Sequence, residues 1–380
     1  MPRAYLDHAS SSPLRPAALE AMLPYLRLSP ADPGRVHSDG RATRVALEAA
    51  REAVADLLGA RPREVVFTAT GTEAINAAVY GAVARARDGT GPHLVTTAVE
   101  HSAVLEACRR ADADVTVVGV DREGHVRADD VLAALRSDTA LVNVQLANHE
   151  VGTTQTAIAD VSAETRERDV LLHVDACAAA GHVPLDFASL GADLCSVTAH
   201  KLGGPKGAAA LLVRRGVRLP SFLVGGAQER ARRAGIEDVP ALVGFGAAAA
   251  ELAADDRLTA EAAAARAQTD RLVAGACAVD GVTQLGDARD RLPHLVCLAV
   301  SDVEAEPVLL GLDQRGIAVH SGSSCSSEAL EPSPVLAAMG VDADRSLRPS
   351  VGWSTTDDDV TMFVEAFPEV VAKMRALRGT

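Results

Sequence analysis

The most informative segment of this chain is Ser196-Val-Thr-Ala-His-Lys-Leu-Gly-Gly-Pro-Lys-Gly207. Small and apolar residues lead to Lys201, and a glycine–proline turn and the apolar run 208–213 follow. This pattern predicts a strand, a tight loop and a second strand, with the lysine held at the bend. A lysine fixed in an apolar loop can form a Schiff base with a carbonyl compound; the alternative is a structural or surface lysine.

Strand-like and helix-like segments alternate on the N-terminal side of this stretch. We expect strands at 64–68, 93–97, 115–120, 140–146, 170–174 and 193–198, and helices at 16–26, 42–58, 102–110, 128–134 and 158–168. Such alternation predicts an α/β fold with a mostly parallel sheet covered on both faces. Ligands of these sheets bind at the carboxyl ends of the strands. Polar residues end four of them, namely Glu100-His101, Asn148-His149-Glu150, Asp175 and His200-Lys201.

The segment Ala69-Thr-Gly-Thr-Glu-Ala-Ile-Asn76 lies between an expected strand and a long alanine-rich helix. Free backbone N–H groups and the helix dipole converge at such a turn, which favours a bound phosphate. The turn could equally be a simple helix cap. The polar loop 29–40 could likewise border a site or be a surface loop.

The C-terminal part has a different pattern. A charged, glycine-containing loop covers 225–240, and one long helix is expected from Ala241 to Cys277. Strands near 294–300 and 318–320, a helix at 304–315 and a final helix from Asp357 predict a smaller α+β domain. We expect a large domain at 12–250 and a small domain formed by 1–11 together with 251–380.

Composition excludes several classes of protein. The chain has 380 residues, 48% of them hydrophobic and 23% charged, and a formal net charge of -14. This acidic balance argues against a general nucleic-acid binder. No signal peptide or membrane-spanning stretch is evident, so we expect a cytoplasmic protein without a membrane partner.

Six cysteines are scattered along the chain without metal-ligand spacing, so no metal site is expected. Five lie among apolar neighbours and are expected to be inert core residues. Cys325 differs, because the run Ser321-Gly-Ser-Ser-Cys-Ser-Ser cannot pack as core. Such a loop exposes its thiol, as a nucleophile requires.

A series of short motifs occurs in a fixed order: Tyr5-Leu-Asp-His-Ala9, Asp32-Pro-Gly-Arg-Val-His-Ser-Asp-Gly40, Thr72-Glu-Ala-Ile-Asn76, Glu100-His101, Asn148-His-Glu-Val-Gly152, His173-Val-Asp175, His200-Lys201 through Gly207, the Cys325 run, and Leu347-Arg-Pro-Ser-Val-Gly352. In these motifs the chain resembles the group I cysteine desulfurases over nearly its whole length. This family lies within the class V aminotransferase branch of fold-type I pyridoxal 5'-phosphate (PLP) enzymes. The resemblance implies PLP as cofactor and L-cysteine as substrate.

The resemblance also implies a role for each matching residue. Lys201 would bind PLP covalently and later move the substrate Cα proton. Asp175 would pair with the pyridinium nitrogen, His101 would lie over the ring, and Arg348 would bind the substrate carboxylate. Four residues would surround the phosphate, namely Gly71, Thr72, Thr198 and His200. Cys325 would attack the substrate sulfur and carry it as a persulfide.

Three positions depart from the family pattern. His149 stands where an asparagine usually precedes Glu-Val-Gly, and Ala178 stands where a glutamine usually follows the strand-end aspartate. Both positions contact the ring-hydroxyl side of PLP in the family, so either Asn148 shifts to bind cofactor and substrate or His149 donates instead. Ile236 replaces a threonine that adds a phosphate contact from the partner subunit. These changes should weaken PLP binding or alter its electronics.

The leading prediction is therefore a homodimeric, PLP-dependent cysteine desulfurase that forms L-alanine and passes sulfur to an acceptor protein. The chain ends without the tail that many relatives use to dock an iron–sulfur scaffold, so a different acceptor is expected. One alternative is a PLP-dependent C–S β-lyase or other aminotransferase-like enzyme that acts on a cysteine conjugate. A second is a non-enzymatic sulfur-relay or scaffold protein.

Overall fold

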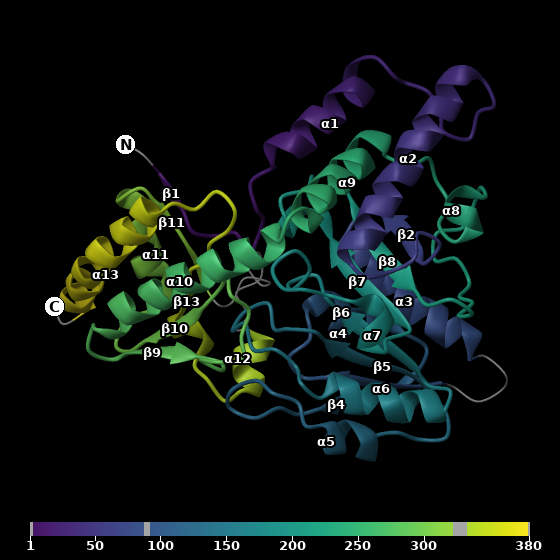
Figure 1. Cartoon of the computed structure of the whole chain (residues 1–380). Coiled ribbons are helices and arrows are strands. Elements are labelled where there is room, and N and C mark those ends of the chain that lie inside the picture. Colours follow the sequence, from purple (N-terminus) through teal and green to yellow (C-terminus); the bar gives the residue numbers. More distant parts are fainter. Residues whose placement is uncertain (1–2, 87–91, 322–332, 379–380) are drawn as a thin grey trace.

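The computed structural model describes residues 3–86, 92–321 and 333–378 of the chain. Figure 1 shows a large sheet flanked by helices and, beside it, a smaller group of strands and helices from the C-terminal part. The N-terminal strand β1 (Ala4–Tyr5) lies with this smaller group, where it pairs with β11 (Ile317–Ala318) in parallel. The chain thus starts on one side, forms the large sheet and returns.

The large sheet has seven strands in the order β2-β8-β7-β6-β5-β3-β4. Their bounds are β2 (Val65–Thr68), β3 (His93–Thr97), β4 (Asp114–Val118), β5 (Thr139–Gln145), β6 (Leu171–Asp175), β7 (Leu194–Thr198) and β8 (Ala209–Val213). Strands β3 to β7 pair in parallel, whereas β8 is antiparallel to both β2 and β7. The expected mostly parallel α/β sheet is confirmed.

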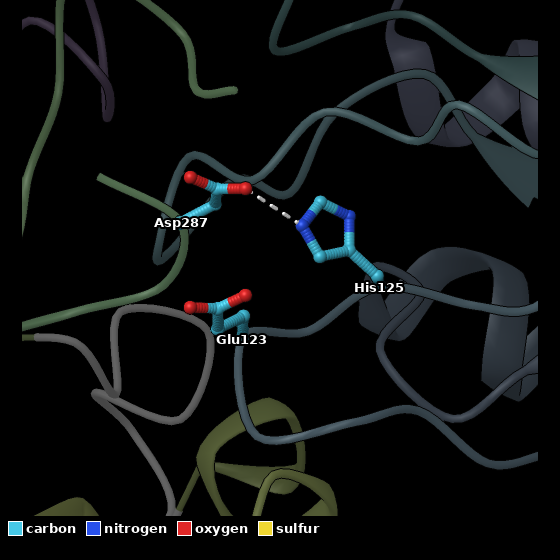
Figure 2. A group of neighbouring side chains, drawn as sticks. All are labelled: Glu123, His125 and Asp287. Carbon is cyan, nitrogen blue, oxygen red and sulfur yellow. Dashed lines mark hydrogen bonds and ion pairs between the residues drawn. The ribbon is translucent and has the colours of Figure 1, made fainter. Parts of the chain in front are cut away.

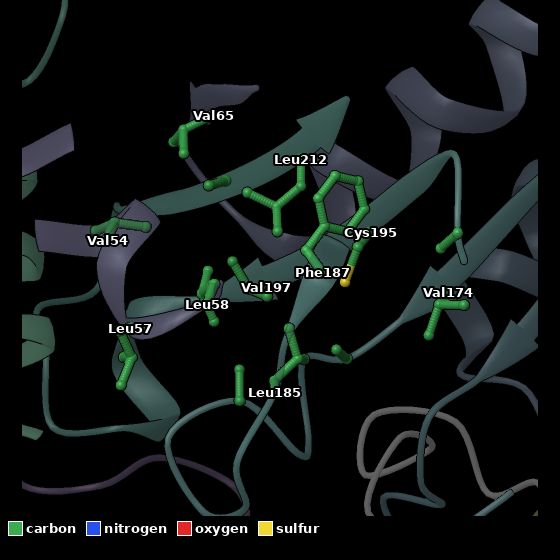
Figure 3. Close-up of a cluster of buried hydrophobic side chains, with 14 of the residues drawn as sticks. Val54, Leu57, Leu58, Val65, Val174, Leu185, Phe187, Cys195, Val197 and Leu212 are labelled. Carbon is green, nitrogen blue, oxygen red and sulfur yellow. The ribbon is translucent and has the colours of Figure 1, made fainter. Parts of the chain in front are cut away.

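Helices cover both faces of this sheet, because alternate strand residues join different cores. Leu172, Cys195 and Leu212 belong to a core shared with α2 (Ser38–Leu57), α6 (Ile158–Glu167), α7 (Phe187–Leu190) and α9 (Val239–Ala253). Figure 3 shows part of this core, with side chains from strands and from the segments beside them in contact. The neighbouring residues Leu171, Leu194 and Leu211 face α3 (Gly71–Arg85) and α4 (Ser102–Arg110). The near-continuous apolar strands follow from burial on both sides.

The C-terminal part forms a four-stranded antiparallel sheet in the order β12-β13-β10-β9. Its strands are β9 (Val282–Leu285), β10 (Cys297–Val300), β12 (His320–Ser321) and β13 (Ser346–Arg348). The helices α10 (Arg257–Cys277), α11 (Ala305–Gln314) and α13 (Asp357–Arg378) share a core with this sheet, which Ala4 and Leu6 complete. The remaining elements are α1 (Pro16–Arg27), α5 (Ala128–Ala133), α8 (Gln228–Ala231), α12 (Pro334–Ala338) and the 3-10 turns η1 (Ala199–Lys201) and η2 (Ala343–Arg345).

Several expected boundaries are wrong. The single helix expected from Ala241 to Cys277 is two helices, α9 and α10, because the chain turns at Asp255 and Asp256, which have φ values of 44° and 58°. Helix α2 begins at Ser38 rather than Ala42, since His37 caps it: the Nδ1 atom of His37 accepts from the Gly40 N–H at 3.2 Å. Strands β9 and β13 and helix α12 were not expected, because each is short and lacks a clear periodicity.

The expectation of five inert core cysteines also fails in part. Cys108, Cys195 and Cys297 are buried as expected, but Cys277 is exposed at the end of α10. Cys177 is only partly buried and lines a cavity at the carboxyl end of β6. Among the helices that the structure describes, none combines the length and apolar character needed to cross a membrane.

Candidate active site

A cavity of about 340 Å³ opens at the carboxyl ends of the parallel strands. Its lining comprises Ala9, Ser10, Thr70, Gly71, Thr72, Ile75, His101, Gln145, Ala147, His149, Asp175, Cys177, Ala178, Thr198, His200, Lys201 and Arg348. This is the place where ligands of such sheets bind. The lining combines a lysine, an arginine, a carboxylate and the start of a helix, so it suits a ligand with several charged groups.

Lys201 lies directly after β7, in the 3-10 turn η1. The turn is closed at its base by the Ala199 N–H, which donates to the Ala208 carbonyl at 3.1 Å, and β8 then leads away. Beside the lysine, Thr198 Oγ1 and His200 Nδ1 form a hydrogen bond of 2.8 Å. Burial and the neighbouring cations Lys201 and Lys206 lower the pKa of His200 to about 4, so this ring is neutral at physiological pH.

Asp175 ends β6 on the floor of the cavity, where it is 7% exposed. Its Oδ1 atom accepts from the Cys177 N–H at 2.9 Å, which fixes the carboxylate. Within residues 3–86, 92–321 and 333–378, no cationic side chain lies within ion-pair distance of Asp175. A carboxylate buried in this way favours a ligand that brings a positive charge.

The N-terminus of α3 forms another wall. Thr70 caps the helix by accepting from the Glu73 N–H at 3.0 Å, and Gly71 and Thr72 follow in the first turn. A Cβ atom on Gly71 would lie 2.8 Å from Cys177 Sγ and 3.6 Å from Thr198 Cβ, so only glycine leaves this corner open. The free N–H groups of the first turn make this corner suitable for a phosphate.

Two imidazoles form the opposite wall. The rings of His101 and His149 meet edge to face, with centroids 5.0 Å apart. His101 caps α4, since its Nδ1 atom accepts from the Ala103 N–H at 3.0 Å, and this fixes the ring. His149 Nε2 lies 3.6 Å from the buried carboxylate of Glu150. The His149 ring can therefore donate toward the cavity or toward Glu150.

Arg348 reaches the cavity from β13 in the C-terminal part. Its Nη1 group donates to the His149 carbonyl at 3.0 Å and its Nη2 group to Ser10 Oγ at 2.7 Å. The Asp7 carboxylate lies 3.4 Å from Nη2. The guanidinium is thus held by two other segments of the chain and presents a fixed positive charge to the cavity, where it suits a carboxylate.

Most of the residues expected from the sequence converge on this cavity, and one does not. Asn148 is fully buried outside the lining, where its Oδ1 atom accepts from the N–H groups of Glu150 and Val151 and its Nδ2 group donates to the Val99 carbonyl. Its amide therefore shapes the loop that presents His149. Cys325 lies outside the described residues.

Sequence reasoning missed Ser10, Gln145 and Cys177 in the cavity lining. Cys177 follows Asp175 by two residues, which was the available signal. The thiol was assigned to the core because its neighbours in sequence are alanines.

A separate group of possible metal ligands lies away from this cavity lining. Figure 2 shows Glu123, His125 and Asp287, whose ligand atoms lie within 4.8 Å of one another. His125 Nε2 and Asp287 Oδ2 form a hydrogen bond of 3.0 Å, which joins the loop before α5 to the segment after β9. This hydrogen bond explains why two of the three side chains lie together.

Comparison with known sequences identifies the family to which this chain belongs. Residues 4–363 match the family model described as aminotransferase class-V, so the chain belongs to the class-V aminotransferase family. It is 43% identical over 386 residues to the IscS-like cysteine desulfurase of Mycobacterium tuberculosis, with 98% of this chain and 97% of that protein covered.

Two solved structures agree with this assignment. A NifS-like protein has a TM-score of 0.90 at 29% identity, and the match covers 98% of this chain and 100% of the chain of that protein. A structure described as SspA in complex with cysteine has a TM-score of 0.81 at 28% identity, and the match covers 92% of this chain and 99% of the SspA chain. The resemblance to cysteine desulfurases and the fold-type I architecture are therefore confirmed.

PLP is the cofactor of this family, and the cavity fits it. The corner that Gly71 leaves open suits the phosphate, and Asp175, which has no cationic partner among the described residues, suits the protonated ring nitrogen. Lys201 lines the same cavity and can reach the aldehyde. The donor set thus matches the phosphate, the ring nitrogen and the reactive carbonyl of PLP.

Proposed function

We propose that this chain is a PLP-dependent cysteine desulfurase that converts L-cysteine to L-alanine. The observation that carries the proposal is the convergence of Lys201, Asp175 and Arg348 on one cavity. A lysine alone suits many carbonyl reactions, but an arginine held at the rim by Ser10 and the His149 carbonyl selects an amino acid through its carboxylate.

Each residue then has a defined task. PLP, when bound, supplies an electron sink for the electron pair left at the substrate Cα. Arg348 holds the substrate carboxylate and so orients the Cα–H bond. Gly71, Thr72, Thr198 and His200 hold the phosphate.

Sulfur leaves the substrate through Cys325 in this proposal. The Cys325 thiolate attacks the substrate sulfur, an S–S bond forms and the C–S bond breaks. The carbon receives a proton, so that L-cysteine and one enzyme thiol become L-alanine and one enzyme persulfide. An acceptor protein then takes the terminal sulfur. The proposal includes a homodimer, a cytoplasmic location and the domain division at residues 11–12 and 250–251.

The test is a product assay with PLP-loaded protein and L-cysteine. We expect alanine in the first turnover, a persulfide on Cys325 by mass spectrometry, and loss of both in Cys325→Ala. Cys277→Ala is the matched control, because Cys277 is exposed on α10, outside the cavity lining, and its removal should leave alanine formation unchanged. Pyruvate and ammonia in place of alanine would contradict the desulfurase and indicate a C–S β-lyase. Protein that binds no PLP would indicate the non-enzymatic alternative.

A further inference from the structure

Each main-chain carbonyl from His200 to Gly203 is fixed by a hydrogen bond from another segment. The Ser12 N–H donates to the His200 carbonyl at 2.8 Å, and Arg15 donates to the next two carbonyls after the lysine, through Nε to Leu202 at 3.0 Å and through its N–H to Gly203 at 2.8 Å. The carbonyl of Lys201 itself lies 3.0 Å from His182 Nε2. Because a carbonyl can only accept, His182 carries its proton on Nε2.

The segment that carries His182 is built for a close approach to the lysine loop. Gly181 has a φ of +80°, and a Cβ atom there would collide with the side chain of Leu202. The His182 N–H donates to the Ala179 carbonyl at 3.0 Å, which closes a turn after Asp175 and Cys177. This turn follows the carboxyl end of β6, so it sets the position of the His182 imidazole relative to Asp175.

A second imidazole fixes the plane of the first. The rings of His182 and His294 are stacked, with centroids 3.5 Å apart and an interplanar angle of 12°. His294 is 1% exposed, and its carbonyl accepts from the Val351 N–H at 2.8 Å. Its Nδ1 atom has no hydrogen-bond partner among the described residues. Stacking rather than hydrogen bonding therefore explains why an imidazole is placed there.

The imidazole rings of His182 and His294 are both neutral. Burial lowers the pKa of His182 to about 3 although the hydrogen bond to the Lys201 carbonyl acts to raise it, and burial lowers the pKa of His294 well below its ordinary value. The nearby cation Lys201 lowers the pKa of both rings. Arg15 adds to this effect at His182 and Arg348 at His294, while His8 acts on both rings. A neutral stack can hold the main chain at Lys201 without repelling the side-chain ammonium group.

We propose that His182 is a positioning residue, which holds the Lys201 carbonyl through Nε2–H while stacking on His294 holds the His182 ring. Nζ of Lys201 is thereby delivered to one place in the cavity for attachment of PLP and for proton transfer. The inference rests on the proposed function only in that Lys201 binds PLP. It does not depend on the fate of the substrate sulfur.

The experiment compares His182→Met, which keeps side-chain volume and removes the donor, with His182→Gln, which restores an N–H donor at a similar reach. We expect the PLP dissociation constant of His182→Met to rise about tenfold, as the loss of one hydrogen bond to a buried carbonyl implies. We also expect the pH midpoint of the visible PLP band to move by about half a unit. In the cysteine assay kcat should fall with KM nearly unchanged. His182→Gln should recover most of each change.

His93→Met is the matched control. His93 is another buried imidazole, and both of its ring nitrogens lie 2.8 Å from threonine hydroxyls, of Thr139 and Thr116, outside the cavity lining. It should lower thermal stability but leave the PLP dissociation constant and the pH midpoint unchanged. His294→Ala removes the stacked ring and leaves the His182 donor in place. It should shift the PLP dissociation constant and the pH midpoint in the same direction as His182→Met. It therefore provides the test if His182→Met does not fold.

Wild-type PLP affinity and pH midpoint in His182→Met would overturn the proposal, as would a His182→Gln variant no better than His182→Met. PLP binding is measured without cysteine, so failure of alanine formation alone contradicts the desulfurase and leaves the role of His182 standing. Wild-type protein that binds no PLP would contradict both.

Discussion

Two carboxyl groups that follow β3 and end β6, the strands on either side of β5, have opposite environments. Asp175 lines the cavity, whereas Glu100 is 1% exposed beneath it. Glu100 Oε1 accepts from Thr97 Oγ1 at 2.7 Å and from the Gln145 N–H at 2.8 Å, while Oε2 has no partner among the described residues. Burial, with a smaller contribution from Asp175, raises the pKa of Glu100 to about 7. Glu100 thus keeps the strand ends together and leaves Asp175 as the carboxylate that faces the cavity.

This raised pKa makes the stability of the protein depend on pH. The pKa of Glu100 rises from 4.5 to about 7 on folding, so its contribution is fully present below pH 4.5 and is lost as pH rises to about 7. Glu100→Gln keeps an acceptor and cannot ionise. Relative to wild type it should gain about 3 kcal/mol between pH 4.5 and pH 8. Urea unfolding at both pH values measures this gain, and a difference that does not change with pH would contradict the raised pKa.

Arg348 provides a second test at the level of one side chain. Arg348→Lys keeps the positive charge but loses the fork that binds Ser10, the His149 carbonyl and a substrate carboxylate together. Loss of one charge-assisted hydrogen bond predicts a KM for L-cysteine raised about 10- to 100-fold. PLP binding should change little. An unchanged KM would show that the substrate carboxylate binds elsewhere.

At the scale of elements, a buried ion pair helps to hold the segment between β8 and α9. Glu229 accepts from Arg51 on α2 at 2.7 and 2.6 Å and from the Phe67 N–H at 2.9 Å. Three consecutive residues, Glu229 to Ala231, have φ values of 47°, 59° and 59°, which non-glycine residues rarely adopt. The ion pair with Arg51 compensates for this strained backbone.

Removing one partner of this pair should destabilise the protein strongly. Arg51→Met leaves the Glu229 carboxylate buried without compensation, and we expect a loss of about 3–5 kcal/mol in the free energy of unfolding. The double variant Arg51→Met/Glu229→Gln should recover much of that loss, since no buried charge remains. Arg109→Met is the control, because its pair with Glu106 is exposed, and it should leave stability almost unchanged. Equal effects of the two single variants would contradict the argument.

The sequence allowed prediction of the elements whose patterns are local. The apolar runs around Val174 and Val197 predicted buried strands, and the polar residues after them predicted the site, because parallel strands place their carboxyl ends at one edge. The break between α9 and α10 could not be predicted, since alanine-rich sequence continues on both sides of Asp255. Asn148 and Cys177 were misplaced for a related reason. Whether a side chain at a strand end faces the cavity or its own loop depends on backbone turns that the residue types do not reveal.

At the scale of the whole molecule, the cavity forms where three distant segments meet. The N-terminal segment brings Ala9 and Ser10, the large sheet brings Asp175 and Lys201, and β13 brings Arg348. The Ala9 N–H donates to Ser350 Oγ at 2.9 Å, which ties the beginning of the chain to the strand end that follows Arg348. Arg348 and Lys201, to which we assign the substrate carboxylate and the cofactor, thus lie beside different cores, and their separation depends on how these cores pack.

We expect the proposed homodimer to bury an apolar surface that is exposed on the single chain. Tyr80 and Phe222 meet with ring centroids 5.6 Å apart, and Leu223 and Val224 continue this exposed apolar surface, with Val224 85% exposed. Burial of this surface against a second copy would explain its composition. Val224→Glu would place a charge in such an interface and should raise the dimer dissociation constant at least about 100-fold. Light scattering after gel filtration should then report 39.3 kDa for the variant and twice that mass for wild type. Leu310→Glu, on α11 in the C-terminal part, is the matched control and should remain dimeric. A wild-type mass of one chain would contradict the dimer, and a dimeric Val224→Glu would place the interface elsewhere.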